Sequence, residues 1–591
     1  MSLIHHRHRM VSLATVAALA LGLPAVGSSL AGSPAQAADP AGDCLEAFPV
    51  DELAADDEVT GKTVTRGTTP VPFTGTVLGV LEDGIAPDVD MIMVDVEMPE
   101  FTRTGGIWQG MSGSPVYAED GRLIGAVAYG LSAGPSPIAG VTPFEDMDDY
   151  LATTPASRVP LRGAAARKVA ATAGISAAKA AQGFRELPMP LGVSGLSARR
   201  LAQLQTKGPA FLDKSTYLLG RASAQAAGPE TLVAGGNLGV SAAYGDVALA
   251  GVGTVTSVCD GRVVGFGHPM ALLGATTMGL HPADAIYVQP DSLGSPFKVA
   301  NLAPAVGTIT DDRTTGVTGT FGAPPSAATI TSTVTYGTRA RTGRTAVSVP
   351  DFLAEASLYQ LIANQDRVID GPAKGTSLLT WRITGTEGSK PFALAFTDRF
   401  TSTDLGLEAH MGVADLVYSL GQLDGVTITS VSAKAAVTND LRRHAISAVE
   451  QKRGGQWVKI TRRSPAFGRA GKSIRLRVVV GGRAGKQVLP LKPIKLPKRS
   501  PGLLMLVAQG GDGAYTDTSG SSVAKVRTAL AAQVRHDQVQ VQVGTPNRMD
   551  FGGEEEEYLM GRRKVSFVRT QKTAPLGHVV SGMKMFTVLV G

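Results

Sequence analysis

The sequence predicts a mainly β protein built from two related β-rich halves. Runs of Val, Thr and Ser are separated by turn residues, the chain holds 71 glycines, and aromatic residues make up only 5%. Short strands joined by turns are typical of this composition. The second observation is an internal repeat, because residues 120–125 read DGRLIG and residues 260–265 read DGRVVG. An Asp-Gly pair between apolar strands indicates a hairpin whose turn residues adopt positive φ. Two related halves would produce this repeat, although a six-residue match also arises by chance.

The N-terminal residues predict export. Residues 1–37 combine a basic head containing Arg7 and Arg9, an apolar run over 11–26 and an A-x-A end, which is the pattern of a secretory signal peptide. An uncleaved signal anchor is the alternative, but the apolar run is short and contains Pro24. No later stretch approaches the roughly 20 apolar residues of a membrane-spanning helix. We therefore expect a secreted or cell-envelope protein with no transmembrane segment after signal removal.

Composition shifts divide the rest of the chain. Alternating apolar segments begin at Phe73, an Ala- and Arg-rich stretch with helical runs follows, and a second β-rich block leads to a helix with an Asp cap near residue 351. The expected segments are an N-terminal lead-in over 38–72, a first β-half over 73–155, a helical connection over 156–230, a second β-half with a following helix over 231–426, and a C-terminal, β-sandwich-like region over 427–591.

Residues 110–115 read GMSGSP and have the form G-x-S-G-x-P. A serine hydroxyl attacks a carbonyl only when a base removes its proton and hydrogen-bond donors stabilise the oxyanion. Flanking glycines allow a sharp turn, so the amide N–H groups of Gly110 and Ser112 can converge into an oxyanion hole. Ser112 is the candidate nucleophile. Ser114 is the fallback, read as a loop residue because Pro115 favours extended geometry before it. An ordinary tight turn would use the same residues.

The base should be a histidine, and six histidines remain after signal removal. His268 lies between Gly267 and Pro269 and belongs to the hairpin that repeats the hairpin of the serine segment. His578 has a similar immediate setting but lacks the preceding Gly-Thr-Val strand and Asp-Gly turn. A lone histidine is more often structural than catalytic. The local glycines and the repeat favour His268.

These segments resemble the SpoIVB-type serine peptidases. The stretch TGGIWQGMSGSPVY with DGRLIGAVAYG resembles their nucleophile segment, GVGTVTSVCDGRVVGFGHPM resembles their histidine segment, and VGTITDDRTTGVTGTFG resembles the block that follows. The resemblance covers residues 75–150 and 230–345. It implies a chymotrypsin-like double β-barrel and hydrolysis of peptide bonds, with Ser112 as nucleophile and His268 as general base.

The chain departs from the family pattern in two ways. The family's histidine segment precedes its serine segment, whereas Ser112 comes first here, so we expect a circularly permuted pair of barrels that preserves the site geometry. The family's acidic residue lies shortly before the serine, where Glu97 stands here. Asp95 would share its face of a strand. Both carboxylates also fit as strand-surface charges, and Asp312 is a further candidate.

Two cysteines, Cys44 and Cys259, could form one disulfide in an oxidising compartment, or stay as free thiols. The mature chain has neither a C-x-x-C pair nor a His-rich tract, so we expect no metal and no cofactor.

Positive charge is concentrated in residues 441–500, where 17 Lys and Arg face one Glu, a net charge of +16. In an exported protein this favours anionic cell-envelope polymers over nucleic acid as the partner. A solvated β-surface would carry the same charges.

Two functions follow from the sequence. The first is an exported serine endopeptidase that acts on proteins or peptides and also cuts itself between residues 151 and 230, a long and Arg-rich stretch of the kind that proteolysis favours. The alternative is a non-catalytic envelope-binding or scaffold protein that retains the peptidase fold.

Overall fold

The computed structural model describes most of the chain after residue 43. The predicted signal peptide lies outside the described part. Among the described residues, no helix has both the length and the apolar character needed to span a membrane. The described residues are 44–147, 158–187, 192–212, 216–218, 227–291, 296–372, 374–499, 502–514, 520–545 and 567–591.

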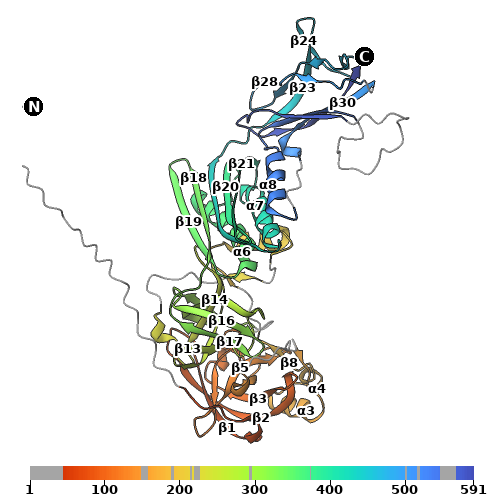
Figure 1. Cartoon of the computed structure of the whole chain (residues 1–591). Coiled ribbons are helices and arrows are strands. Elements are labelled where there is room, and N and C mark those ends of the chain that lie inside the picture. Colours follow the sequence, from red (N-terminus) through yellow and green to blue (C-terminus); the bar gives the residue numbers. More distant parts are fainter. Residues whose placement is uncertain are drawn as a thin grey trace, which may run out of the picture. The chain divides into compact units, whose positions relative to one another are not determined.

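The first six strands form a closed barrel, the first of two (Figure 1). The strands pair in the order β1-β2-β3-β6-β5, and β4 closes the ring by pairing with both β1 and β5. Every residue of β5 is buried, because one face of the strand packs in the barrel core and the other face packs against neighbouring parts of the chain. The elements are β1 (Glu58–Thr63), β2 (Val71–Ala86), β3 (Val89–Glu97), α1 (Phe101–Thr104), β4 (Pro115–Tyr117), β5 (Leu123–Leu131), β6 (Ile138–Pro143) and α2 (Phe144–Met147).

This barrel begins earlier than the sequence predicted. β1 and the start of β2 come from residues 38–72, which we expected to be a lead-in, and β1 pairs with β2 along its whole length. The inward face of β1 consists of Val59, Gly61 and Thr63. Only one of these three residues is a large apolar side chain, so the hydrophobic pattern of the strand is weak.

A second six-stranded barrel follows, which confirms the double β-barrel. Its strands pair in the order β12-β13-β17-β16-β14-β11, and the ring closes where β11 pairs with β12. β15 pairs with the far end of β14. The strands are β11 (Asn237–Gly245), β12 (Leu249–Cys259), β13 (Arg262–Gly265), β14 (Gly274–Gln289), β15 (Phe297–Leu302), β16 (Gly307–Arg313) and β17 (Gly316–Phe321).

The repeated Asp-Gly pairs form hairpin turns in both barrels, but the turns differ. Asp260 and Gly261 both have positive φ, at +49° and +74°, as predicted for a tight turn. In the first barrel only Gly121 does so, at +86°. Asp120 instead accepts the backbone N–H of Arg122 with its carboxylate at 2.9 Å. This longer turn therefore needs one left-handed residue, and the prediction of two was wrong there.

The connection between the barrels contains helices and also short strands that the sequence analysis missed. β8 pairs with β5 of the first barrel, and β9 pairs with β12 of the second. Strands of two or three residues carry too little periodicity to be read from sequence. The elements are β7 (Arg158–Val159), α3 (Gly163–Thr172), α4 (Ala177–Ala180), β8 (Phe184–Glu186), β9 (Gly192–Val193), α5 (Ala198–Lys207) and β10 (Tyr217–Leu218).

Residues 328–438 extend the sheet of the second barrel, because β19 pairs with β11, and they add two helices where we expected one. α6 and α7 pack on each other and on this sheet, with Leu358, Leu361 and Val417 in the shared core (Figure 1). β22 pairs with β18 and β20, so it belongs here and not to the C-terminal region that we began at residue 427. The elements are β18 (Ala328–Tyr336), β19 (Arg339–Val347), α6 (Leu353–Ile369), β20 (Gly375–Glu387), β21 (Lys390–Ser402), α7 (Leu405–Gly421) and β22 (Val426–Thr438).

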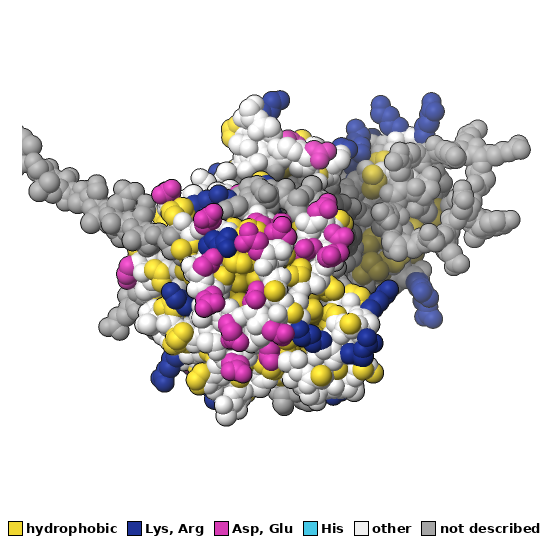
Figure 2. All heavy atoms as spheres, turned by 90° about the horizontal axis from the view of Figure 1, so that it is seen from below, with side chains coloured by type: hydrophobic (Ala, Val, Ile, Leu, Met, Phe, Trp, Pro, Cys, Tyr) yellow, Lys and Arg dark blue, Asp and Glu magenta, His cyan; other side chains and the backbone are white. Residues whose placement is uncertain are grey.

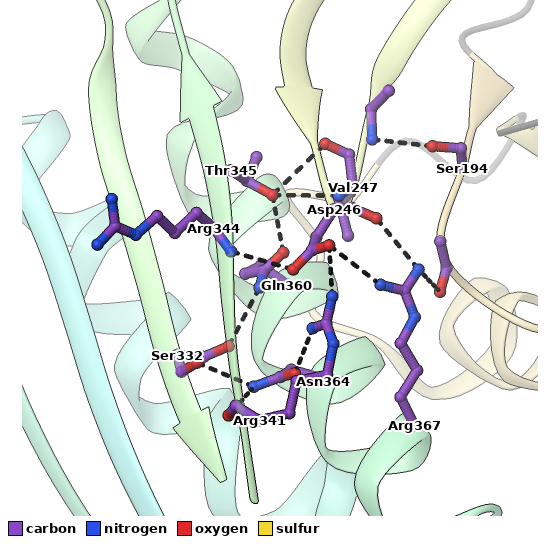
Figure 3. Close-up of polar contacts among 12 residues, drawn as sticks. Ser194, Asp246, Val247, Ser332, Arg341, Arg344, Thr345, Gln360, Asn364 and Arg367 are labelled. Carbon is purple, nitrogen blue, oxygen red and sulfur yellow. Dashed lines mark hydrogen bonds and ion pairs between the residues drawn. The ribbon is translucent and has the colours of Figure 1, made fainter. Parts of the chain in front are cut away.

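A partly buried network of polar contacts connects the turn between β11 and β12 to β19 and α6 (Figure 3). Arg341 Nη2 donates to Asp246 Oδ1 at 2.6 Å, and the backbone N–H of Arg344 donates to Asp246 Oδ2 at 3.0 Å. Arg367 Nη1 adds a contact of 3.3 Å to the same carboxylate. Burial raises the pKa of Asp246, but these hydrogen bonds and charges outweigh it and hold the pKa below its ordinary value.

The C-terminal region consists of two main sheets that share one apolar core, which includes Val449, Val478, Leu506 and Val541. This arrangement has the layered form of a sandwich. The first sheet contains β24 (Gln456–Lys459), β23 (His444–Arg453), β27 (Leu476–Gly481), β28 (Gln487–Pro490) and β33 (Val580–Ser581); the second contains β25 (Ala466–Gly468), β34 (Met583–Val590), β30 (Leu503–Gly510), β31 (Val539–Gly544) and β32 (Val568–Lys572), with α8 (Val523–Ala532) between β30 and β31.

A disulfide joins Cys44 to Cys259, which decides between the two states that the sequence left open. Cys44 precedes a bridge between Ala47 and Leu123 of the first barrel, and Cys259 ends β12 of the second barrel. The bond therefore crosslinks the two barrels.

Candidate active site

Ser112 lies on the loop that leads into β4, and two glycines shape this loop. Gly110 and Gly113 have φ values of +91° and +93°, which glycine adopts readily and other residues do not. A Cβ atom on Gly113 would lie 1.9 Å from the carbonyl oxygen of Thr254. The loop can therefore approach the second barrel this closely only with glycine at position 113.

The second barrel fixes the serine loop through β12. The backbone N–H of Thr254 donates to the Ser112 carbonyl at 2.8 Å, and its hydroxyl donates to the Gly110 carbonyl at 3.0 Å. The hydroxyl of Thr256 donates to the Gly113 carbonyl at 2.9 Å. Three hydrogen bonds thus hold the loop of one barrel against a strand of the other.

The first barrel in turn fixes the histidine loop. His268 follows Phe266 and Gly267, which both have a φ of +70°. The hydroxyl of Thr142, on β6, donates to the Gly267 carbonyl at 2.6 Å. A Cβ atom on Gly267 would lie 3.0 Å from the Cβ of Ala128 on β5. Each loop is therefore held by the opposite barrel.

The contact between the two barrels brings together Ser112 and His268, which are 156 positions apart in the sequence. Ser112 Oγ and His268 Nε2 are 2.8 Å apart. His268 Nδ1 lies 2.8 Å from the carbonyl oxygen of Pro269, which can only accept a hydrogen bond. Nδ1 therefore carries a proton in this arrangement, and Nε2 can accept the proton of the serine hydroxyl. Both side chains are 0% exposed.

The carboxylate beside the histidine is not one that the sequence indicated. Glu186 Oε1, at the end of β8, lies 3.2 Å from His268 Nδ1. Asp95 and Glu97 lie on β3, and in the described part of the chain neither is within ion-pair distance of His268. Burial, together with the charge of Glu97, raises the pKa of Asp95. Glu186 was missed because it lies in a segment that we expected to be helical, and no motif marks it.

Asp312 supports the histidine loop from β16. Its carboxylate accepts the backbone N–H groups of Met270, Ala271 and Leu273 at 2.7, 2.9 and 3.2 Å. Burial raises the pKa of Asp312, while these hydrogen bonds and the nearby His268 oppose the rise. Asp312 thus fixes the residues that follow the histidine and does not contact the ring.

The amide groups expected to form the oxyanion hole have no competing partner. Within the described ranges, the backbone N–H groups of Gly110 and Ser112 donate to no acceptor, whereas Met111 and Gly113 between and beside them are hydrogen-bonded. Free N–H groups beside the hydroxyl are what a developing oxyanion requires.

The fallback serine and the second histidine have other partners. Ser114 Oγ lies 2.6 Å from the Met111 carbonyl and 2.9 Å from the Thr63 hydroxyl, so its hydroxyl braces the loop. His578 Nε2 lies 3.2 Å from Asp440 in the C-terminal region. Neither residue contributes to the Ser112–His268 pair.

A second buried serine–histidine pair lies inside the second barrel. Ser241 Oγ is 2.7 Å from His281 Nε2, on the adjacent strands β11 and β14. Burial lowers the pKa of His281 to about 4, although its hydrogen bond with the Ala303 carbonyl opposes this. Ser241 lies within β11, opposite Ala250 of β12 and Gly279 of β14, and the register with β12 shifts just after it. The Ser112 loop differs from this strand because two of its amides have no acceptor among the described residues.

A comparison with known protein families matches the part of the chain that contains the serine loop. Residues 72–142 match the family described as SpoIVB peptidase S55. This segment is therefore similar to that peptidase family. No curated protein and no solved structure matches the chain. The SpoIVB match contains Ser112 and its strands β2 to β6, and it ends before the second barrel that supplies His268.

Proposed function

We propose that the chain is an exported serine endopeptidase in which Ser112 is the nucleophile and His268 the general base. The family match implies a peptidase. The observation that carries the assignment is the 2.8 Å contact between Ser112 Oγ and His268 Nε2, on two loops that are each held by the opposite barrel. The substrate is a protein or peptide.

The reaction follows from the positions of the groups. His268 Nε2 takes the proton of Ser112 Oγ while the oxygen attacks the substrate carbonyl. The N–H groups of Gly110 and Ser112 stabilise the oxyanion. His268 then protonates the leaving amine, and water hydrolyses the acyl-enzyme by the same route in reverse. The Pro269 carbonyl holds the proton on Nδ1, and Asp312 keeps the histidine loop in place.

A fluorophosphonate probe, which reacts with activated serines, tests this proposal. We expect labelling of the wild-type protein, loss of labelling in Ser112→Ala and His268→Ala, and retained labelling in Ser114→Ala. Circular dichroism and a melting curve of each variant show that it is folded. Labelling that survives in folded Ser112→Ala would contradict the assignment.

We propose export on two grounds. Residues 1–37 have the composition of a signal peptide, and the Cys44–Cys259 disulfide suits an oxidising compartment. N-terminal sequencing of the protein isolated from its producing cells should begin near residue 38. A mature protein that begins at Met1 would contradict export by cleavage.

We also propose that the enzyme processes itself within residues 151–230. This stretch is long and rich in Ala and Arg, which is the kind of segment that proteolysis favours. Mass spectrometry of the purified protein should find new termini in this range, and they should be absent from Ser112→Ala prepared in the same way.

The second candidate function rests on charge. Residues 441–500 carry a net charge of +16, and we propose that they attach the protein to anionic cell-envelope polymers. Retention on such a polymer should fall steeply as salt increases. If the probe labels no serine and retention persists, the non-catalytic scaffold is the better account.

A further inference from the structure

One edge of β5 carries two strands in succession. β4 pairs with β5 as far as Ala126, and the serine loop continues this contact, because Gly113 N donates to the Val127 carbonyl at 2.8 Å. From the next residue onward β8 takes over, and Leu187 N donates to the Ala128 carbonyl at 3.0 Å. β6 occupies the other edge of β5. β8 therefore runs directly toward the nucleophile loop.

The register of β8 is that of an added antiparallel strand. Arg185 is opposite Gly130, and Glu186 is opposite Tyr129. Extended peptides bind to proteins in this way, with main-chain hydrogen bonds giving affinity and alternate side chains entering pockets. β8 thus uses the part of the edge beside Ser112 that an extended substrate would need.

The last residue of β8 and the residue after it lie beside the Ser112–His268 pair and the serine loop. Leu187 is 2% exposed and packs in the cluster that contains Ile107, Trp108 and Met111, the residues just before Ser112. A Cβ atom on Gly130 would lie 2.9 Å from Leu187 Cδ2, so the absence of a side chain there makes room for the leucine. The preceding residue, Glu186, contacts His268.

We infer that residues 184–187 occupy the substrate cleft of the enzyme and block it, with Leu187 in the pocket for the residue on the acyl side of the cleaved bond. This inference rests on the proposed peptidase function. It accounts for the complete burial of Ser112 and His268. It also assigns the specificity of the pocket, which accepts leucine-like aliphatic side chains because Ile107 and Trp108 line it and Gly130 leaves it open.

The block is strong because it is intramolecular. A tethered strand competes at an effective concentration on the order of millimolar, so a dilute substrate displaces it only when the segment is loosened. Pro188 follows Leu187 in the sequence. A prolyl nitrogen carries a ring and no N–H, which crowds the leaving group, so we expect the segment to act as an inhibitor and not as a substrate at this bond.

The test releases the segment and measures the reactivity of Ser112. Leu187→Asp places a charge in an apolar pocket and should expel β8, whereas Leu204→Asp changes an equally buried leucine of the same connection, on α5, which packs in a different apolar cluster together with α6 and α7. We expect Leu187→Asp to raise the rate of fluorophosphonate labelling at least tenfold and Leu204→Asp not to raise it. Leu187→Ala, a milder change, should give a smaller increase and serves if the Asp variant does not fold.

A binding measurement separates this inference from the proposed function. The capped hexapeptide QGFREL, residues 182–187, should bind the Leu187→Asp protein in fluorescence anisotropy and inhibit its labelling, whereas QGFRED should do neither. The released enzyme should also cleave peptides with leucine on the acyl side at least tenfold faster than those with aspartate or lysine.

Each outcome decides one of the two claims. If the wild-type protein labels as fast as Leu187→Asp and the hexapeptide does not bind, the cleft is not blocked and the inference is wrong, while the peptidase stands. If no variant labels but the hexapeptide binds, the segment does occupy a groove and the catalytic function is wrong. If neither labelling nor binding occurs, both claims are wrong.

Discussion

Gly113 and Gly121 both have positive φ, at +93° and +86°, but their surroundings differ. A Cβ atom on Gly113 would lie 1.9 Å from the Thr254 carbonyl oxygen, whereas a Cβ on Gly121 would meet nothing within 4 Å. Gly113→Ala must therefore move the serine loop, while Gly121→Ala adds only backbone strain, about 1 kcal/mol.

We expect Gly113→Ala to reduce kcat/KM for peptide hydrolysis at least a hundredfold, since a shift of about 1 Å in a reacting group has this effect. Gly121→Ala should keep nearly full activity and lose a little stability. Both are measured on the Leu187→Asp background, where the cleft is open. Equal activity in the two variants would show that the loop tolerates displacement.

Lys298 is a second residue with an unusual environment, and this environment changes the pKa of its side chain. Its side chain is 3% exposed, and Nζ lies 3.0 Å from Asn237 Oδ1 and 3.5 Å from the Thr254 hydroxyl, which are neutral groups. Burial lowers the pKa of Lys298 to about 7. Between pH 7 and about 10 the unfolded chain binds a proton at this lysine that the folded protein does not, so this group makes stability rise with pH across that window.

Lys298→Met should remove this contribution, about 1.4 kcal/mol per pH unit within the window. Denaturant unfolding at pH 7.5, 8.5 and 9.5 measures it as a smaller gain in stability than in the wild-type protein. Lys168→Met, at a partly exposed lysine, is the control for the loss of one lysine side chain. Parallel pH profiles for wild type and Lys298→Met would contradict the lowered pKa.

At the scale of elements, the Asp246 network holds a turn of the second barrel to β19 and α6 (Figure 3). Asp246→Asn removes the charge that Arg341 and Arg367 face, which should cost about 2 kcal/mol in the free energy of unfolding. Asp120→Asn, in the exposed pair with Arg122, should cost much less, because solvent screens the charges of that pair.

Lowering the pH should reduce the difference in the free energy of unfolding between the wild-type protein and Asp246→Asn. The pKa of Asp246 is held below its ordinary value, so its contribution is present above about pH 4 and is lost as pH falls through the folded-state pKa. Urea unfolding at pH 7 and pH 3 measures both effects. An undiminished difference at pH 3 would mean that the charge is not the cause.

At the scale of the whole molecule, the disulfide between Cys44 and Cys259 restrains two barrels that share one site. The bond spans 215 positions, and closing a loop of this size typically contributes about 2–5 kcal/mol. Reduction, or the double variant Cys44→Ser and Cys259→Ser, should lower the midpoint of thermal unfolding and inactivation. Reductant should have no further effect on the double variant, and an unchanged midpoint after reduction would show that barrel packing alone maintains the site.

Charge is divided unequally along the chain. Residues 44–147 contain 17 Asp and Glu against 4 Lys and Arg, a net charge of −13, whereas residues 441–500 carry +16. Figure 2 shows acidic side chains gathered around apolar ones on one face of the molecule. The barrel that bears Ser112 therefore attracts cationic peptides.

We expect kcat/KM of the released enzyme to be higher for peptides flanked by lysine than for matched peptides flanked by glutamate. The difference should shrink as salt rises from 20 to 500 mM, because the Debye length falls below the distances over which the field acts. A salt-independent preference would indicate a direct contact in the cleft.

The sequence by itself predicted two related β-rich halves and indicated both Ser112 and His268, because strand composition, Asp-Gly turns and glycine-flanked serine motifs are local features. The double barrel, which the resemblance to a peptidase family implied, is confirmed by the structure. The sequence did not determine which acid stands near the histidine, that β8 lies on β5, or that Cys44 meets Cys259. Those facts depend on segments distant in sequence that meet only after both barrels close and dock. A strand as short as β8 has no periodicity of its own, and its place is set by the free edge that β5 offers beside the nucleophile loop.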